Sequence, residues 1–388
     1  MLRDSSIDHS THVFGKDAVR YQHGRERRIV VAHGLNTMFG IGSGRAGTVQ
    51  FVLLWHGDAE ETMAKVMARK REKASKYGDR YRFPSPDGKL MFSSVRRSEG
   101  QARTIRFVKT KNLGSGQFGE VFKALDVDTG KLMAVKQLKT GKVATEAERL
   151  KKLQQYQLLE REMHAIRQAR HPNIIEYLGS QGWGGGNVKI FTSLKDGDLV
   201  SLIQAGEDAE QVARRVLCHM LRALDYLACI EIIHRDVKPD NILYTFEPNG
   251  RAVFILTDFG CSSRANTAKS IIGTRIYMAP EMSMGGLQTP KVDVWSLFVT
   301  MMWILDVHGF RALERRITCA VEIQQIVAFA AATPWLSGIQ EMAAPDPLHR
   351  ASAAQMLVGL YGGKGLTTPV DRIPPMLGRR RGNHHFVF

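Results

Sequence analysis

The chain has 388 residues, of which 44% are hydrophobic and 24% charged, so it is long enough for two or three globular domains with sizeable cores. Its 54 Lys and Arg residues outnumber its 38 Asp and Glu residues, which gives a formal charge of +16. Such a charge attracts phosphate-bearing partners of any kind. No homeodomain, zinc-finger or RNA-binding signature in the sequence supports a nucleic-acid partner. No apolar run approaches the roughly 18 residues of a membrane helix, and the four cysteines contain no CxxC pair, which argues against a membrane protein, a disulfide framework and a zinc site.

Residues 1–104 predict a small accessory region that is partly β-rich. Apolar stretches at residues 29–32 and 48–55 have the character of strands, and a basic helical stretch at residues 60–76 is followed by a proline-containing loop. The polar N-terminus lacks the apolar core of a signal peptide, so we expect the protein in the cytoplasm, the nucleus or both.

A glycine-rich turn at residues 113–121 is the first element with a chemical signature. Its glycines at 114, 116 and 119 remove side chains where a backbone must approach phosphates. The GxGxxG pattern alone is weak, because residues 42–47 match it too; a strand-like segment follows that first match, which predicts only a hairpin turn.

The second match is followed by Met133-Ala134-Val135-Lys136, which places a lysine on an apolar strand. A partly buried ammonium group needs an anion, because an unpaired buried charge is costly. The long helical pattern that follows contains two candidate carboxylates, Glu160 and Glu162.

The pattern then changes from strands to helices. An apolar strand covers residues 190–194, helices dominate after Gly197, and Pro248-Asn249-Gly250 marks the turn of a strand pair. A β-rich part followed by a helical part predicts an α+β fold with two lobes.

The strongest signal is a series of three motifs between residues 234 and 281. They are His234-Arg235-Asp236-Val237-Lys238-Pro239-Asp240-Asn241, then Asp258-Phe259-Gly260, and then Met278-Ala279-Pro280-Glu281. Together with the glycine-rich turn and Lys136, they resemble the motifs of the eukaryotic protein kinases.

The resemblance runs from about residue 106 to residue 362 and implies the bilobal kinase fold. We expect a kinase domain at 105–363, with an N-lobe at about 105–195 and a C-lobe at about 196–363. A basic tail is expected at 364–388.

The resemblance further implies a serine/threonine kinase that transfers the γ-phosphate of ATP to protein hydroxyls, with ATP and Mg²⁺ as cofactors. Asp236 would orient or deprotonate the hydroxyl, and Lys238 would neutralise the γ-phosphate. Asp-x-Lys in this loop resembles the serine/threonine form. Asn241 and Asp258 would hold the magnesium ions.

Two further roles come from alignment to the family. Counting back from residues 171–173, Glu162 would pair with Lys136, with Glu160 as the alternative. Phe191 would be the gatekeeper of the adenine pocket. The expected nucleotide-binding residues are Leu113, Gly114, Ser115, Gly116, Gln117, Phe118, Gly119, Val121, Ala134, Lys136, Thr192, Leu194, Asn241 and Asp258.

Regulation and partners follow from the same comparison. Arg235 would bind a phosphate on the activation segment, residues 258–281, most simply on Ser270, with Thr267 and an unmodified loop as alternatives. An upstream kinase or autophosphorylation would supply that phosphate. Asp240 and Asp198 predict a weak preference for protein substrates with basic sequences.

Structural residues and departures complete the comparison. Arg350 resembles the arginine that pairs with Glu281, and Asp293 resembles the aspartate that anchors the catalytic loop. Phe298 stands where glycine is usual. The long spacings from Lys136 to the helix glutamate and from Asn241 to Asp258 resemble those of calmodulin-dependent and checkpoint-type kinases.

In checkpoint-type kinases a forkhead-associated domain often precedes the catalytic one. Residues 14–55 resemble a degenerate version of it, with an ordinary β-rich extension as the alternative. The rival to an active enzyme is a catalytically weak kinase-fold scaffold or adaptor.

Overall fold

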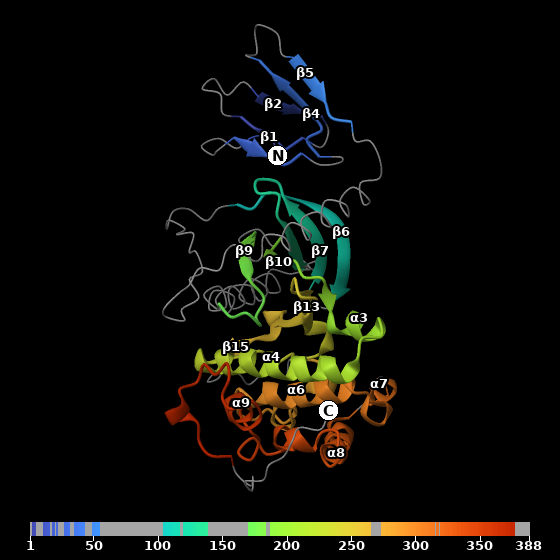
Figure 1. Ribbon diagram of the computed structural model, residues 1–388, viewed down its shortest axis with the longest axis vertical. Coiled ribbons are helices and arrows are strands. Elements are labelled where there is room, and N and C mark those ends of the chain that lie inside the picture. Colours follow the sequence, from blue (N-terminus) through green and yellow to red (C-terminus); the bar gives the residue numbers. More distant parts are fainter. Residues whose placement is uncertain are drawn as a thin grey trace, which may run out of the picture. The chain divides into compact units, whose positions relative to one another are not determined.

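The structure is a computed structural model that describes residues 2–4, 11–15, 18–19, 21, 27–31, 35–42, 49–54, 104–116, 119–138, 170–183, 187–264, 273–314, 316–317 and 319–376. It divides into two compact units (Figure 1). The first unit comprises Met1–Lys139, Gly179–Gly182 and Asn187–Leu194. The second unit comprises Thr140–Leu178, Trp183–Gly186 and Lys195–Phe388.

A five-stranded sheet with the order β6-β7-β8-β10-β9 is the main element of the first unit. Its strands are β6 (Phe107–Gly116), β7 (Gly119–Asp126), β8 (Leu132–Leu138), β9 (Tyr177–Gln181) and β10 (Lys189–Ser193). The alternation of the apolar strand β8 buries Met133 and Val135 on one face. The neighbouring Ala134 and Lys136 therefore point to the other face.

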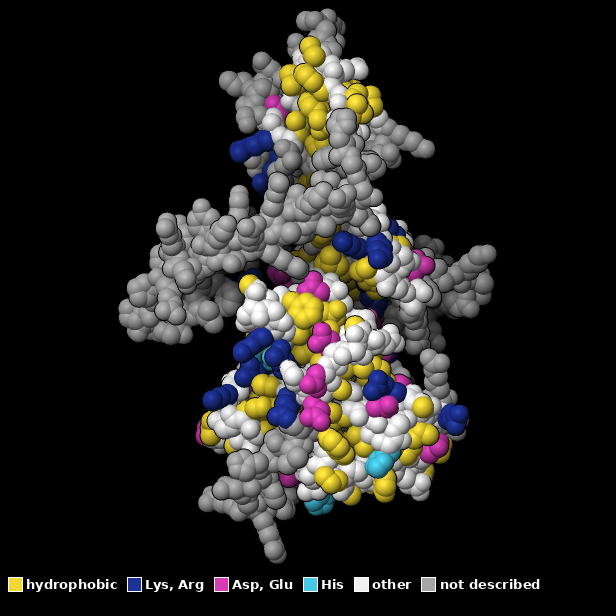
Figure 2. Space-filling view, turned by 45° about the vertical axis from the view of Figure 1, so that its right-hand side comes forward, with side chains coloured by type: hydrophobic (Ala, Val, Ile, Leu, Met, Phe, Trp, Pro, Cys, Tyr) yellow, Lys and Arg dark blue, Asp and Glu magenta, His cyan; other side chains and the backbone are white. Residues whose placement is uncertain are grey.

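The accessory region forms two small sheets, β1-β3 and β2-β4-β5. Their strands are β1 (Leu2–Arg3), β2 (Thr11–Phe14), β3 (Arg28–Ile29), β4 (Met38–Ile41) and β5 (Val49–Val52). Strands β4 and β5 pair antiparallel. The hairpin turn predicted at residues 42–47 lies, from residue 43 on, outside the described residues. The amide of Val30 donates a hydrogen bond of 2.9 Å to the carbonyl of Val127, just after β7. Every residue of the edge strand β5 is exposed, and hydrophobic side chains gather over this sheet in Figure 2.

The second unit is mostly helical. Its helices are α3 (Leu199–Gln204), α4 (Ala209–Cys229), α5 (Pro280–Ser283), α6 (Lys291–Ile304), α7 (Phe310–Leu313), α8 (Ala320–Ala331) and α9 (Ala353–Tyr361). Short strands complete it: β11 (Gly197–Asp198), β12 (Ile232–Ile233), β13 (Ile242–Phe246), β14 (Ala252–Leu256) and β15 (Ser263–Arg264). The hairpin of β13 and β14 turns at residues 247–251, as the sequence predicts.

Helix α4 begins at Asp208, whose carboxylate accepts hydrogen bonds from the amides of Glu210 and Gln211. Its apolar residues recur every three or four positions and form one buried face, which packs against α6, α9 and β14. Helix α6 differs, because 13 of its 14 residues are buried, Phe298 among them. It is the central helix of this unit, and bulky Phe298 is accommodated within the core.

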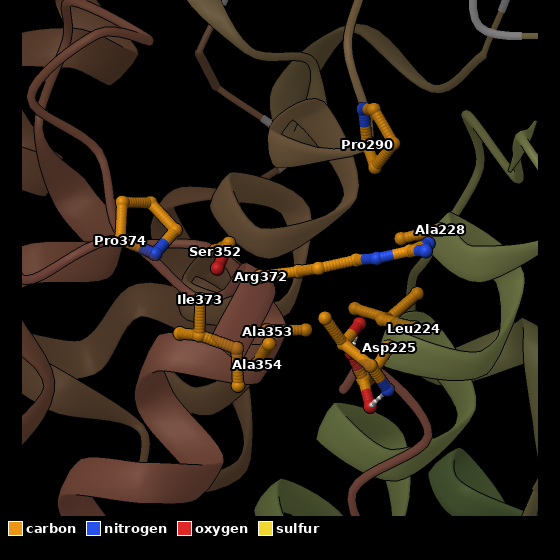
Figure 3. A pocket seen from close by; sticks show the side chains of 11 residues that line it. Leu224, Asp225, Ala228, Pro290, Ser352, Ala353, Ala354, Arg372, Ile373 and Pro374 are labelled. Carbon is orange, nitrogen blue, oxygen red and sulfur yellow. Dashed lines mark hydrogen bonds between the residues drawn. The ribbon is translucent and has the colours of Figure 1, made fainter. Parts of the chain in front are cut away.

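The segment at residues 362–376, here called the strap, lies against α4 and α9. The buried carboxylate of Asp225 on α4 accepts hydrogen bonds from the amides of Thr367 (2.6 Å) and Thr368 (3.1 Å) and from the Thr368 hydroxyl (2.5 Å). Gln355 on α9 donates to the carbonyl of Pro374 at 2.9 Å. The two helices and the strap line a cavity of about 190 Å³, which the Arg372 side chain crosses (Figure 3). Residues 364–376 of the expected tail are thus bonded to the helical unit, while residues 377–388 lie outside the described residues.

The predicted α+β fold, with strands first and helices after them, is confirmed. Among the described residues, no single helix is both long and apolar enough to cross a membrane; only α6 taken with residues 307–313 passes that test, and this pair is bent by 103°.

Candidate active site

The register of the five-stranded sheet places four of the expected nucleotide-binding residues on one face. Lys136 of β8 is paired with Val121 of β7 and with Ile190 of β10, and Ala134 is paired with Thr192. Directly opposed residues of antiparallel strands share a face, as do residues two apart on one strand. Val121, Ala134, Lys136 and Thr192 therefore lie on the same face, opposite to the buried Met133 and Val135.

The same register corrects the expected gatekeeper. Phe191 is paired with Val135, so its side chain lies on the face away from Lys136. It is fully buried there, and its ring meets that of Phe107 edge to face at 5.2 Å between centroids. Thr192, not Phe191, is the β10 residue whose side chain lies beside Ala134.

Glycine is needed at positions 119 and 114 of the glycine-rich turn for different structural reasons. A Cβ atom at Gly119 would lie 2.2 Å from the carbonyl oxygen of Gln137, so β7 and β8 can pair there only if this residue has no side chain. Among the residues that the structure describes, none has an atom within 4 Å of a Cβ atom placed at Gly114. The space at Gly114 is therefore open, as the close approach of a phosphate to a backbone requires. Leu113 and Ser115 beside it are exposed.

Several expected residues lie outside the described part of the chain: Gln117, Phe118, Glu160, Glu162, Thr267 and Ser270. Gly116 is described only as the end of β6, where it pairs with Gly119. Lys136 is half-buried, as expected of a lysine on an apolar strand. Leu194, just after β10, is half-buried as well.

In the second unit, Asp236 and Lys238 lie together and both bind one hydroxyl group. The Lys238 ammonium lies 3.1 Å from Oδ2 of Asp236. The hydroxyl of Thr274 donates to Oδ1 of Asp236 at 2.9 Å and accepts a hydrogen bond from Lys238 at 2.6 Å. The Thr274 amide also donates to Asp236, at 3.0 Å. This pair can therefore hold an aliphatic hydroxyl between an acceptor and a cation.

Asn241 and Asp258 have the atoms that a magnesium site needs. The amide nitrogen of Asn241 donates to the carbonyl of Asp236 (2.7 Å) and to its Oδ2 (2.8 Å), which leaves the amide oxygen of Asn241 as the atom suited to a cation. The Thr257 amide donates to the Asn241 carbonyl at 2.9 Å, so Asp258 follows directly after a residue bonded to Asn241. Asp258 has a positive φ of 60°. Carboxylate and amide oxygens are the ligands Mg²⁺ prefers, so these residues fit the ion.

The loop around Asp236 is anchored to α6 by Asp293. This buried carboxylate accepts hydrogen bonds of 2.8 Å from the amides of both His234 and Arg235. Burial raises the pKa of Asp293, and His234 and the two amides oppose that shift. The expected anchoring role of Asp293 thus agrees with the geometry.

His234 connects the loop to the segment that begins at Asp258. Its Nε2 lies 2.9 Å from the Thr257 carbonyl, while its Nδ1 accepts a hydrogen bond of 3.3 Å from the Asp236 amide. These partners select the tautomer protonated at Nε2. The ring also meets that of Phe259 edge to face at 4.7 Å. Asp236 and Asp258 are thus held in place through one histidine.

Arg235, the expected phosphate ligand, has a positive φ of 65° and donates to the carbonyls of Cys261 (2.6 Å) and Ser262 (3.3 Å). These bonds fix the start of the activation segment. Thr274 is the functional residue that sequence reasoning missed. The available signal was a hydroxyl residue directly after Gly273, in the last part of the activation segment and before Ala279-Pro280-Glu281.

Comparison with known proteins agrees with this geometry. The family model described as "Protein kinase domain" matches residues 107–359. The chain is 30% identical over 236 residues to the serine/threonine-protein kinase BCK1/SLK1/SSP31 of Saccharomyces cerevisiae, covering 59% of this chain and 16% of that protein. It is 28% identical over 286 residues to the CBL-interacting serine/threonine-protein kinase 15 of Arabidopsis thaliana, covering 70% and 64%. It is 31% identical over 209 residues to the mitogen-activated protein kinase kinase kinase 3 of the same plant, covering 52% and 31%. The chain therefore spans less than two thirds of the length of each of these relatives.

Proposed function

This chain belongs to the protein kinase family, and on that premise we propose that it transfers the γ-phosphate of ATP to serine and threonine hydroxyls of protein substrates. The observation that carries the proposal is the hydroxyl of Thr274 bound between Oδ1 of Asp236 and the ammonium of Lys238. The pair has the shape and charges needed to bind a substrate hydroxyl of the same kind.

Asp236 acts on the hydroxyl of the substrate. Its Oδ1 is the acceptor for that proton, and its Oδ2 is held by Asn241 and Lys238, so the carboxylate has one defined orientation. Lys238 places a positive charge beside the same hydroxyl, where it offsets negative charge on the transferring phosphate.

Protein kinases use ATP and Mg²⁺, and we assign both to this chain. The bound metal would supply charge neutralisation for the transferring phosphoryl group. In the second unit Asn241 and Asp258 would hold it. In the first unit the open backbone at Gly114 would approach the phosphates, and Lys136 would bind them. The pairing of Lys136 with Glu162, or with Glu160, stays a prediction, because both glutamates lie outside the described residues. Ala134, Thr192 and Leu194 would contact the adenine.

Regulation and substrate choice are further parts of the proposal. A phosphate on Ser270, or on Thr267, would bind Arg235 and order the activation segment. An upstream kinase or the enzyme itself would add it. Of the two acids expected to favour basic substrates, Asp240 is exposed, whereas Asp198 accepts the Ser201 amide at 2.7 Å as the N-cap of α3. We therefore assign the basic preference to Asp240. We also propose the cytoplasm or nucleus as the site of action.

A phosphotransfer assay tests the proposal. The protein is incubated with radiolabelled ATP, magnesium and a generic basic protein, and Asp236→Asn is compared with the wild type. Because a general base contributes about 10²- to 10⁴-fold, the variant should lose at least about 100-fold in rate. Asp371→Asn, a change at an exposed carboxylate, serves as the matched control and should keep full activity.

Equal incorporation by the wild type and Asp236→Asn would reject the enzyme and favour the kinase-fold scaffold. Phosphoamino-acid analysis of the product completes the assay. Phosphotyrosine as the main product would contradict the serine/threonine assignment.

A further inference from the structure

One carboxylate in the second unit binds two buried donors from different elements. Glu314, the residue after α7, accepts a hydrogen bond of 2.9 Å from the Tyr277 hydroxyl on Oε1. Its Oε2 accepts one of 3.0 Å from the indole nitrogen of Trp303, in the last turn of α6. Tyr277 and Trp303 are only 2% and 7% exposed. Glu314 therefore ties the last part of the activation segment, at Tyr277, to the central helix α6.

Tyr277 is connected in turn to the pair that binds the hydroxyl. Its amide donates to the carbonyl of Thr274 at 2.9 Å, which closes the turn between these two residues. Its own carbonyl accepts a hydrogen bond of 2.7 Å from Ser296 of α6. Thr274, at the other end of the turn, is bonded to Asp236. A shift of Tyr277 would therefore move the residue that lies against the catalytic carboxylate.

The charges around Tyr277 keep its hydroxyl a donor. Burial raises the pKa of the phenol, and the neighbouring carboxylates of Glu314, Asp240 and Asp236 raise it further. The indole nitrogen of Trp303 is a donor only. The site thus needs two acceptor atoms, and a carboxylate supplies both of them at once. An amide side chain has one acceptor oxygen, and alanine has none.

We infer that Glu314 is a positioning residue for the phosphotransfer reaction. Through Tyr277 it fixes the turn at residues 274–277, and with it the place of the substrate hydroxyl at Asp236. The inference rests on the proposed kinase activity and adds a residue to it. Glu314 acts on the binding of the protein substrate, because the residues assigned to ATP lie on other elements.

Steady-state kinetics of Glu314→Ala, Glu314→Gln and the wild type test the inference with a basic protein substrate and ATP as the two varied reactants. For Glu314→Ala we expect kcat/KM for the protein substrate to fall about 10- to 100-fold, since two buried donors lose their acceptor. The KM for ATP should stay within about twofold. Glu314→Gln keeps one acceptor and should recover a large part of the loss. Glu247→Ala, at an exposed glutamate in the turn between β13 and β14, is the control.

Thermal unfolding of each variant separates positioning from folding. If Glu314→Ala unfolded at a lower temperature, lost both kinetic constants in parallel and was not rescued by Glu314→Gln, the residue would be merely structural and the inference overturned. Equal kinetics for Glu314→Ala and Glu247→Ala would overturn it as well. An inactive wild type would overturn the proposed kinase activity and this inference with it.

Discussion

Arg350 and Glu281 are 69 residues apart in the sequence, and two hydrogen bonds of 2.7 and 3.0 Å join the guanidinium to the carboxylate. The Arg350 side chain is completely buried. Its remaining donors bind the carbonyls of Ala344 and Pro345, both at 2.9 Å, and of Lys291 at 3.2 Å. The guanidinium also lies over the ring of Trp295. The resemblance to the kinase family predicted this pair, and the structure shows that the polar groups of both partners are satisfied.

Breaking this pair should destabilise the protein strongly. Arg350→Met would leave the Glu281 carboxylate buried without its cation, which costs about 3–5 kcal/mol in comparable cases. Urea unfolding measures the change, with Arg251→Met in the exposed β13–β14 turn as the control. Replacing both partners by methionine should restore part of the lost stability. A loss below about 1 kcal/mol for Arg350→Met would show that the buried pair is not a main source of stability.

Two of the three glycines in the glycine-rich turn, Gly114 and Gly119, should separate ATP binding from folding. Gly119→Ala places a Cβ atom against the Gln137 carbonyl and should lower the unfolding temperature, because backbone must move. The new methyl group in Gly114→Ala would meet no atom of the described part of the chain, so the fold should be unchanged, while the KM for ATP should rise severalfold. Differential scanning fluorimetry and ATP titration measure the two effects. Unchanged ATP kinetics in Gly114→Ala would argue against a phosphate at that position.

The strap offers a matched pair of threonines. Thr368→Val removes the hydroxyl that donates to the buried Asp225 and should cost about 1.5–3 kcal/mol, as expected for a hydrogen bond to a charged group. Thr367→Val keeps the backbone amide that binds Asp225, so its effect should be small. Urea unfolding of both variants measures the difference. Similar losses for the two would mean that the hydroxyl of Thr368 contributes little.

Stability should fall in mild acid because of two half-buried histidines, His171 and His219. Burial and the nearby Arg222 lower the pKa of both His171 and His219 to about 4. Since these values lie below the usual 6.5, the folded state resists protonation and the unfolded state binds more protons below pH 6.5. The two histidines therefore contribute fully to the free energy of unfolding above about pH 6.5, and this contribution is lost as the pH falls toward 4.

Unfolding temperatures at pH 7.5 and 5.0 test this dependence. Nδ1 of His219 accepts the Phe254 amide at 3.2 Å, which requires the unprotonated nitrogen. His219→Gln keeps an acceptor but does not titrate, so the drop between the two pH values should be smaller in this variant. An identical drop would assign the acid sensitivity to other groups.

The reaction residues could be predicted from the sequence because their geometry is local. Asp236, Lys238 and Asn241 lie within six consecutive residues, and the fold of that loop brings them together. Thr274 and Glu314 were not predicted, since each acts on a residue 36 to 38 positions away and no short motif marks that distance.

Two other differences also have physical causes. Successive side chains of a strand lie on opposite faces, so an alignment error of one residue assigns a side chain to the wrong face. For this reason Phe191 was predicted as the gatekeeper, although the side chain beside Ala134 is that of Thr192. Most of the strap lies in the segment 364–388, which the sequence predicted as a tail because Pro374-Pro375 and Arg379-Arg380-Arg381 match that composition. Its attachment depends on one buried carboxylate in a helix more than 140 positions earlier in the sequence, which composition does not reveal.

Helix α6 holds the Asp236 loop through Asp293. It holds the turn at residues 274–277 directly through Ser296, and by way of Glu314 through Trp303. Since 13 of its 14 residues are buried, almost no position of this helix can be substituted without affecting the packing of the core. Among distant homologues, these positions should change slowly and in compensating pairs, while β5 and the turn between β13 and β14 change quickly. Alignments of remote relatives should therefore start from this helix. An alignment error of one residue in it would misassign both the residue that holds the Asp236 loop and the residues that hold the turn at residues 274–277.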